Sequence, residues 1–474
     1  MAVPATVAAW ERARFSSGRR SRIAFCTLIV AAVAAFLLFN RLGEIRHPIW
    51  DEAYNLPTAA RFEAGRAQFA SHPPLGLMLI AAGDRLSGLN AGVDQRALAA
   101  VKAIRSEDMP PGYDYRGPRL ASALFGTLGA ALFFLLMVEL TRSAGAALAL
   151  STLYLCDTAL LAQFRAAHLD AFQLAFALAA MLCAARMHSA RSARSGLGWA
   201  LGFGCAAACA ALVRANGVVL FVMAPFAVWP LLGAREWCAA AVRTLAIGGG
   251  AAIALAVVAA SYVLLSREPP AAETVAGAQD GRFVSAAHKT ALESGDWSVG
   301  SVVAASRDYA AYMRADLEAI PRRDPNGSHP LGWLIGKGAI LYRWDASSTS
   351  FRVLALVPNH AAWLLSLLGV VWTAIRCLRR RDALRLMLLA GWAAAMGVLA
   401  WLDHLRVLYV YHYFIPLLIG HALLALAWRE ARFSQRPAQV GLAAIALSFA
   451  AAAPLALHQD TGRWRCELFL PQCP

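Results

Sequence analysis

The sequence predicts an all-α integral membrane protein, a polytopic bundle of about eleven transmembrane helices with interfacial helices in its first outer loop. Three observations predict this class. Hydrophobic residues make up 59% of the 474 residues and charged residues only 15%, which leaves too little polar surface for a water-soluble protein of this size. Apolar runs long enough to cross a bilayer recur along the chain. Arginine-rich connectors separate these runs, as expected where positive charge fixes the orientation of membrane segments.

The net charge of +15 does not indicate a nucleic-acid partner. The arginines cluster in short connectors between apolar runs, where membrane orientation accounts for them. We therefore expect no nucleic acid as a partner.

The N-terminal part of the chain sets the predicted topology. Residues 1–22 are basic and are expected to stay in the cytoplasm, so the first span, 23–40, leads outward. This run has no small-residue cleavage site after it and is expected to be a retained helix. The outer loop 41–117 contains two amphipathic segments, near 56–69 and 75–87, which we expect to lie in the membrane interface.

Ten more spans complete the predicted bundle. They are 118–140, 144–161, 169–186, 198–214, 217–233 and 244–265 in an N-terminal transmembrane module (23–265), and 355–375, 384–402, 407–428 and 438–457 in a C-terminal group (355–457). The polar region 266–354 is predicted to be a large outer loop, and 458–474 an outer tail. Outside the cytoplasm, Cys466 and Cys473 in that tail can form a disulfide.

The polar residues that could do chemistry all fall on the outer side of this topology. They are Asp51, Glu52, His72, Arg116, Arg119, Arg165, His168, Asp170, His329, Asp403, His404, Arg406, Tyr411 and His412. Ionisable groups at membrane depth are costly, so their gathering on one face predicts a shared site. The alternative is that each one caps a helix or anchors the chain at the interface.

Six motifs, in this order, resemble the protein O-mannosyltransferases and their bacterial relatives. They are DE at 51–52, HPPLG at 72–76, YRGPRLASALFGTLGAALFF at 115–134, QFRAAHLDAF at 163–172, SHPLGW at 328–333 and YVYHYFIPLL at 409–418. That family belongs to the GT-C class of polyprenyl-phosphate-sugar-dependent glycosyltransferases. The resemblance covers about 47–420, with Arg214 in place of a lysine that is usual after the fifth span, and without room for a β-trefoil domain in the outer loop.

The resemblance implies a membrane glycosyltransferase that faces the outside of a bacterial inner membrane. The implied donor is a sugar on a polyprenyl phosphate, with mannose favoured, and the implied acceptor is a hydroxyl group, with protein Ser/Thr favoured. Asp51 matches the catalytic acidic position, and a carboxylate there can deprotonate the attacking hydroxyl group. Glu52 is expected to orient the acceptor or share the proton. Arg119 matches the position that contacts the donor phosphate, which a guanidinium can bind through two parallel hydrogen bonds.

Seven further residues are candidates for the same site. Those for phosphate binding are Arg116 and Arg165, and those for substrate positioning are His72, Asp170, His329, Tyr411 and His412. The alternatives are snorkelling arginines, turn or cap residues and aromatic-belt anchors. No cofactor is predicted, and no dedicated metal site, because the His and carboxylate groupings do not have metal-ligand spacing on one helix.

Three other functions are compared with the same sequence features. The same enzyme class could act on a lipid or surface glycan, such as aminoarabinose transfer to lipid A. A transporter or flippase for a lipid-linked substrate would need polar groups through the bilayer midplane, but the middles of the spans are almost entirely Ala, Leu, Val, Phe and Gly. A non-catalytic membrane scaffold would not need a base and phosphate-binding arginines together.

Overall fold

The protein folds into a helical bundle with the number of spans that the sequence predicts. The computed structural model describes residues 5–190, 193–295, 297–347, 350–379, 382–431, 435–470 and 473. Within them, ten helices are long and apolar enough to cross a membrane, and a pair bent by 65°, Ala144–Leu155 with Thr158–Phe164, would make an eleventh. The prediction of a polytopic membrane bundle is therefore confirmed.

The long helices cover the predicted spans, but the first begins at Ala5, before the predicted 23, and the helix over 244–265 begins at Trp237. They are α1 (Ala5–Phe39), α5 (Arg116–Thr141), α9 (Asp170–Ser189), α10 (Ala193–Val213), α12 (Trp237–Leu265), α17 (His360–Arg379), α18 (Ala383–Asp403), α19 (Phe414–Ala431) and α20 (Gln435–Ala456). The 3-10 helix η2 (Ala215–Met223) continues into α11 (Ala224–Gly233) to complete one more span. The bent pair consists of α6 (Ala144–Leu150), α7 (Thr152–Leu155) and α8 (Thr158–Phe164).

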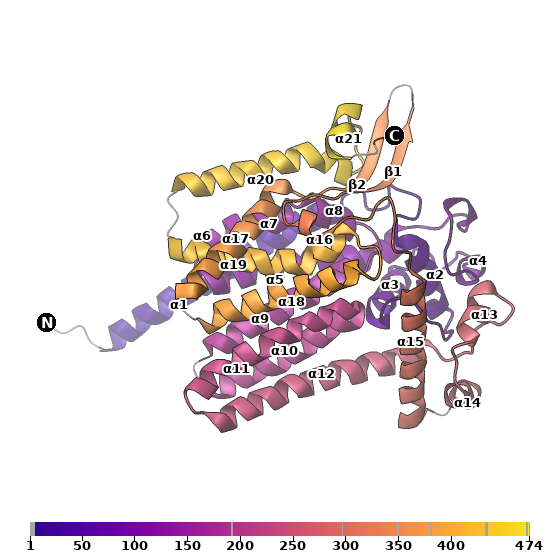
Figure 1. Cartoon of the computed structure of the whole chain (residues 1–474), viewed down its shortest axis with the longest axis horizontal. Helices are drawn as coiled ribbons and strands as arrows, with labels where there is room; N and C mark the ends of the chain where they lie inside the picture. The colour runs from indigo at the N-terminus through magenta and orange to yellow at the C-terminus, as the bar shows by residue number, and fades with distance from the viewer. Residues whose placement is uncertain are drawn as a thin grey trace.

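The segments predicted to lie outside gather at one end of this bundle. Figure 1 shows the long helices side by side, with α2 (Glu52–Glu63), α3 (Pro74–Ser87), α4 (Arg96–Ala99), α13 (Val275–Gly281), α14 (Ala286–Ser294) and α15 (Val299–Ala319) together at the right-hand end. The short η1 (Ser106–Asp108), α16 (Pro330–Trp333) and η3 (Val410–Tyr413) complete the helices of the connectors. The two amphipathic segments of the first outer loop are thus α2 and α3.

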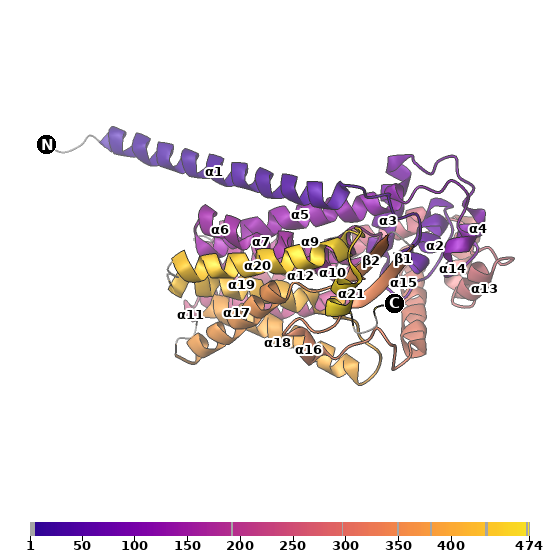
Figure 2. The same cartoon turned by 90° about the horizontal axis from the view of Figure 1, so that it is seen from above.

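The centre of the bundle is α19. In the most apolar stretch of its span, 94% of the residues are buried, against 22% for α1 and for α20. A helix that is apolar on all sides can be surrounded by other helices or by lipid, and α19 is surrounded by helices. By contrast, α1 runs along one edge of the bundle, as Figure 2 shows, and leaves most of its apolar surface for lipid.

The region before α17 differs from the expectation in two details. It adds to the helical fold an antiparallel hairpin of β1 (Ile340–Ala346) and β2 (Phe351–Leu356). The span expected from 355 starts as α17 at His360, because the apolar residues before it form the buried strand β2. A short apolar run does not distinguish a buried strand from the first turn of a helix.

The C-terminal tail packs against this hairpin. Cys466 in α21 (Arg463–Phe469) forms a disulfide with Cys473, as the sequence allows for a tail outside the cytoplasm. Cys466 and Leu470 pack in one apolar cluster with Val353 and Ala355 of β2 and Leu455 of α20. The tail thereby fixes the hairpin to the end of the bundle.

Candidate active site

The acidic pair that the sequence singles out divides into two residues with different surroundings. Asp51 precedes α2 and makes no side-chain cap hydrogen bond to it, so the helix-cap alternative does not explain this residue. Its side chain is 26% exposed, whereas that of Glu52 is fully buried. Of the two, only Asp51 is therefore in a position to meet a substrate.

Both carboxylate oxygens of Glu52 accept hydrogen bonds from other groups of the protein. Its carboxylate accepts hydrogen bonds from the Arg119 Nε at 2.8 Å and from the Arg119 Nη2 at 2.7 Å. It also accepts from the backbone N–H groups of Ile49 and Ala167, each at 2.7 Å. Burial raises the pKa of Glu52, but the Arg119 guanidinium, His168 and the Ala167 N–H together outweigh burial, so the pKa lies below its ordinary value. Glu52 stays ionised, and both its oxygens are occupied, which speaks against the expected role in orienting the acceptor or sharing its proton.

Arg119 has no donor left for a phosphate. Besides the two bonds to Glu52, its Nη1 donates to the carbonyl oxygens of Leu42 at 3.3 Å and Ile45 at 2.7 Å, and its Nη2 donates to that of His47 at 2.9 Å. A guanidinium has five N–H donors, so this set uses all of them. The side chain is fully buried. This geometry assigns Arg119 to the packing beneath the site and argues against the phosphate contact expected for it.

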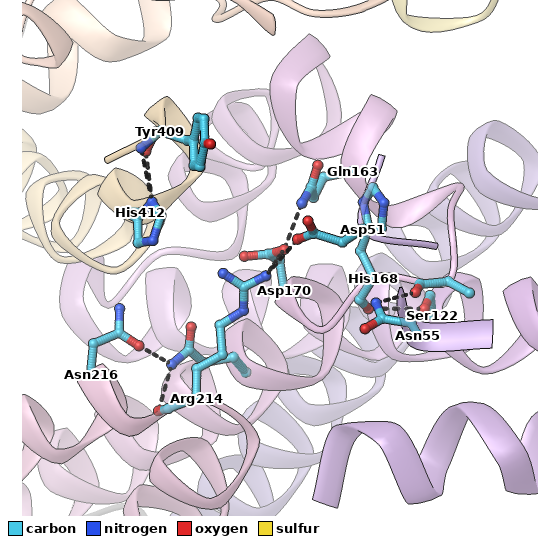
Figure 3. Close-up of polar contacts among 12 residues, drawn as sticks. Asp51, Asn55, Ser122, Gln163, His168, Asp170, Arg214, Asn216, Tyr409 and His412 are labelled. Carbon is cyan, nitrogen blue, oxygen red and sulfur yellow. Dashed lines mark hydrogen bonds and ion pairs between the residues drawn. The ribbon is translucent and has the colours of Figure 1, made fainter. Parts of the chain in front are cut away.

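Asp51 faces a second, different arginine. The Arg214 Nη2 lies 3.5 Å from Asp51 Oδ2 and 3.2 Å from Asp170 Oδ2, so the two carboxylates share one guanidinium (Figure 3). Gln163 of α8 donates to the same Asp170 oxygen at 2.6 Å. Arg214 also lies over the Tyr411 ring, with its Cζ 5.2 Å from the ring centroid. Its Nε is buried and forms no hydrogen bond with any residue in the described ranges. Unlike Arg119, Arg214 retains donors for a ligand.

A tight turn between α10 and η2 sets the position of Arg214. A Cβ at Gly217 would lie 2.5 Å from the Ala210 carbonyl carbon, so a larger residue would push the turn open. The Gln173 side chain of α9 donates to the Arg214 carbonyl at 3.2 Å and to the Asn216 side chain at 2.7 Å (Figure 3). The turn and its neighbour α9 together fix the start of the Arg214 side chain.

The segment before α19 supplies the opposite wall. The Arg406 Nη2 donates to the Nε2 of His412 at 3.1 Å, and the Nδ1 of the same ring lies 3.2 Å from the backbone nitrogen and 2.9 Å from the carbonyl oxygen of Tyr409. The Nε of Arg406 is buried and unpaired within the described part of the chain. The Tyr411 and His412 rings stack with their centroids 4.7 Å apart. Arg406 is thus a second cation with a free donor beside Asp51.

The electrostatics of Asp51 suit a base. Burial raises its pKa above the ordinary value, and the nearby Asp170 raises it further, while His168, Arg214 and Arg406 only partly oppose this. A carboxylate with a raised pKa holds a proton more strongly than an exposed one, which makes it a better acceptor. His168 is fixed by its Nε2, 2.8 Å from the Ile49 carbonyl oxygen.

Strain accompanies this arrangement. Trp50, next to Asp51, has a φ of 50°, which is uncommon for a residue with a bulky side chain. Its ring packs against those of Tyr342 at 5.7 Å and Tyr409 at 5.5 Å between centroids. The Tyr342 hydroxyl donates to Gln163 Oε1 at 2.5 Å, so β1 reaches the site directly. Such strained positions are typical of functional sites.

The structure brings some predicted residues to this cluster and leaves others outside it. Asp170, Tyr411 and His412 join Asp51. His72 lies close enough that the positive charges of Arg214 and Arg406 add to burial, the main cause, in holding its pKa well below the ordinary value.

Three predicted residues have partners elsewhere. The Arg116 Nη2 pairs with Asp114 Oδ2 at 2.5 Å. The Arg165 Nη1 binds the carbonyl oxygens at the C-terminal end of α1, including that of Asn40 at 2.7 Å. His329 is exposed and lies 3.3 Å from Asp403. None of the three hydrogen-bonds or ion-pairs with Asp51 or Arg214 within the described ranges.

Sequence reasoning missed Arg214, Gln163 and Tyr342 as members of the cluster and gave no role to Arg406. Arg214 carried one signal, its place in the position of a usual lysine within the resemblance. Tyr342 lies in a hairpin that no periodicity indicated. Among the described residues, no group of three or more His, Cys, Asp or Glu could hold a metal ion. A partly exposed carboxylate beside two guanidinium groups can take a proton from a hydroxyl group and hold an anionic leaving group.

Comparison with known proteins finds one matching family and relatives that are named as protein mannosyltransferases. Residues 28–264 match the family described as dolichyl-phosphate-mannose-protein mannosyltransferase. Protein O-mannosyl-transferase 2 of Danio rerio is 26% identical over 175 residues, which are 37% of this chain and 22% of the relative. Protein O-mannosyl-transferase 1 of Danio rerio is 28% identical over 215 residues, which are 44% of this chain and 29% of the relative. The chain thus spans less than a third of the length of these curated relatives.

Two solved structures share the fold over nearly the whole chain. The S. cerevisiae protein O-mannosyltransferase Pmt1-Pmt2 complex bound to the sugar donor is similar with a TM-score of 0.72 at 12% identity, covering 94% of this chain and 91% of that chain. ArnT from Cupriavidus metallidurans bound to undecaprenyl phosphate is similar with a TM-score of 0.53 at 16% identity, covering 91% of this chain and 63% of that chain. At these identities the likeness concerns the fold.

Proposed function

Because this chain belongs to the dolichyl-phosphate-mannose-protein mannosyltransferase family, we propose that it transfers mannose from a polyprenyl-phosphate donor to a hydroxyl group of a protein. One observation carries the proposal. The Asp51 carboxylate lies 3.5 Å from an arginine, Arg214, whose Nε has no partner among the described residues. A base and an anion-binding group are therefore adjacent at one end of a membrane bundle.

The reaction assigns one role to each group. The hydroxyl oxygen of the acceptor attacks the anomeric carbon of mannose, and Asp51 takes the hydroxyl proton. The bond between that carbon and the phosphate oxygen breaks, and the polyprenyl phosphate leaves with the electron pair. Arg214 and Arg406 bind the phosphate oxygens as their charge increases, since guanidinium groups stabilise such oxygens through charge-assisted hydrogen bonds. Attack opposite the leaving phosphate inverts the configuration of the sugar.

The surroundings of Asp51 support this division of work. Asp170 and Asp51 share Arg214, so an incoming phosphate competes with both carboxylates for one guanidinium. When the phosphate draws Arg214 away, Asp51 loses part of its stabilisation as an anion and becomes a stronger base. Arg119 and Glu52 act beneath the site by fixing the start of α2.

The location belongs to the same proposal. All the polar groups named above lie at the end of the bundle that the arginine-rich connectors predict to be outside. We place this protein in a bacterial inner membrane, with the site facing outward and a protein as the acceptor partner. A lipid or surface-glycan acceptor is the alternative that the same assay distinguishes.

The test is transfer of radiolabelled mannose from polyprenyl-phosphate mannose in proteoliposomes that contain the protein and a Ser/Thr-rich peptide. Wild type should label the peptide, and Asp51→Asn should reduce the rate by at least about 100-fold, the lower range for loss of a general base. Asp94→Asn is the matched control, because Asp94 is an exposed carboxylate of the same outer loop that pairs with Arg96. Label in lipid and not in peptide would reject the protein acceptor, and equal rates for Asp51→Asn and Asp94→Asn would reject Asp51 as the base.

A further inference from the structure

A large cavity lies apart from the Asp51 cluster, where the outer ends of α1 and α5 meet. It has a volume of about 980 Å³ and is lined by Phe39 at the end of α1, the chain at 41–46, Leu89, the loop before α5 and the start of α5. Asp51, Arg214 and Arg406 are not among its lining residues. Its volume is that of a site for a molecule larger than a few waters.

The polar part of the lining carries one unbalanced positive charge. Arg41 pairs with Glu44, and Arg116 pairs with Asp114. Arg46, which also lines the cavity, is exposed and forms no hydrogen bond or ion pair with any residue that the structure describes, and its charge adds to the hydrogen bond from Arg116 in lowering the pKa of Asp114. Three guanidinium groups thus face two carboxylates, which favours an anionic occupant.

The rest of the lining is apolar and continues into the lipid-facing surface of the bundle. Phe39 and Leu120 line the cavity from α1 and α5. One helical turn further along, Phe36 is 68% exposed on α1 and Leu124 is 57% exposed on α5. Residues three or four apart lie on the same face of a helix, and α1 and α5 run side by side (Figure 2). An apolar surface therefore leads from the cavity along two spanning helices.

We propose that this cavity binds an anionic phospholipid of the outer leaflet, with Arg46 as the ligand of its headgroup phosphate. The unpaired guanidinium matches a phosphate, and the apolar wall below it matches the start of the acyl chains. A soluble phosphate would use Arg46 alone and leave Phe39 and Leu120 without a partner. The lipid is accordingly the source of the phosphate.

The site has a structural connection to the buried ion pair. The segment that provides Arg46 also provides the Ile45 and His47 carbonyl oxygens that bind Arg119, which in turn holds Glu52. A lipid held by Arg46 restrains this segment and so the start of α2. Lipid binding itself is independent of the proposed transferase function and is measured without it.

The experiment is native mass spectrometry of the whole protein released from nanodiscs of equal parts phosphatidylglycerol and phosphatidylcholine. Wild type should retain phosphatidylglycerol. Arg46→Gln should retain about tenfold less, the effect expected for loss of one charge-assisted hydrogen bond. Arg282→Gln, at an exposed arginine that does not line the cavity, should retain as much as wild type. Equal retention by both variants would overturn the proposal.

Two further measurements distinguish a lipid phosphate from a soluble phosphate as the ligand of Arg46. Leu89→Trp places a bulky group in the cavity from an exposed loop position, so it should displace the lipid while the unpaired Arg46 remains. The thermal midpoint of the delipidated protein should rise with phosphatidylglycerol, and not with inorganic phosphate or diacylglycerol. A rise with inorganic phosphate alone, or retention by Leu89→Trp equal to wild type, would contradict a lipid site.

Discussion

The variant Arg119→Leu should lower the stability of the protein, whereas the affinity of the folded variant for the donor should stay unchanged. In Arg119→Leu the Glu52 carboxylate loses two charge-assisted hydrogen bonds at 2.8 and 2.7 Å and stays fully buried. Breaking a buried ion pair by removing one partner costs about 3–5 kcal/mol. Three carbonyl oxygens of the segment before α2 also lose their donor. We therefore expect the free energy of unfolding to fall by at least about 3 kcal/mol.

Two further variants separate the contribution of the Glu52–Arg119 ion pair to stability from that of its other contacts. Glu52→Gln should destabilise the protein by a similar amount, because it leaves the Arg119 charge buried without a carboxylate. The double variant Glu52→Gln/Arg119→Leu should lose clearly less than the sum of the two, since neither charge then remains unpaired. Only one of the Ile49 and Ala167 N–H groups can still bind the amide oxygen at position 52, because the two bind different oxygens of the carboxylate.

The assay is thermal unfolding in detergent micelles, with polyprenyl-phosphate affinity measured at a temperature where each variant is folded. The matched control is Arg105→Leu, at an exposed arginine of the same outer loop that contains Glu52. It should leave the unfolding midpoint unchanged. An Arg119→Leu protein of wild-type stability that had lost its affinity for polyprenyl phosphate would show that Arg119 binds the phosphate and does not act as a structural residue.

Three other predictions follow from the site and the tail. Tyr342→Phe, which removes the hydrogen bond to Gln163, should lower the transfer rate several-fold, by about the 0.5–1.5 kcal/mol of one hydrogen bond, with little change in donor affinity. The transfer rate should fall as the pH drops through the pKa of Asp51, which burial sets above its ordinary value. A carboxyl group whose pKa is raised by folding destabilises the folded protein once it is ionised. Asp51→Asn has no charge at this position, so it should unfold at a higher midpoint than wild type at neutral pH. Cys466→Ser should lower the unfolding midpoint, because the tail loses its disulfide to Cys473 and the free energy of unfolding falls by about 2–4 kcal/mol. A reducing agent should lower the midpoint of wild type and have no further effect on this variant.

The sequence predicts the bundle well because each span carries its own signal. An apolar run of spanning length folds as a helix in a membrane whatever its neighbours are, since its backbone must be satisfied internally. The hairpin before α17 has no such signal, because β2 is buried by the tail and by α20, and these contacts lie far away in the sequence. Its apolar residues therefore read as the start of the next span.

The site shows the same limit in finer detail. Arg119 and Arg214 both lie at the outer end of a predicted span, so their positions in the sequence indicate the two equally as phosphate ligands. Only the hydrogen-bond and ion-pair partners of their side chains distinguish them. Arg119 is surrounded by acceptors from the segment before α2, whereas Arg214 lies between two carboxylates with its Nε unpaired in the described part of the chain. Asp51 could be predicted from its motif. The separate fate of Glu52, one residue later, depends on Arg119, which is 67 residues away.

Donor binding and sugar transfer, measured side by side in Asp51→Asn and Arg214→Gln, separate the proposed base from the proposed phosphate ligand. We expect Asp51→Asn to bind polyprenyl-phosphate mannose at least as tightly as wild type, because a negative charge next to the phosphate is removed, and yet to transfer almost no sugar. Arg214→Gln should bind the donor at least about tenfold more weakly, since it loses a charge-assisted contact. Loss of donor binding in Asp51→Asn, or unchanged binding in Arg214→Gln, would contradict the division into a base and a phosphate ligand.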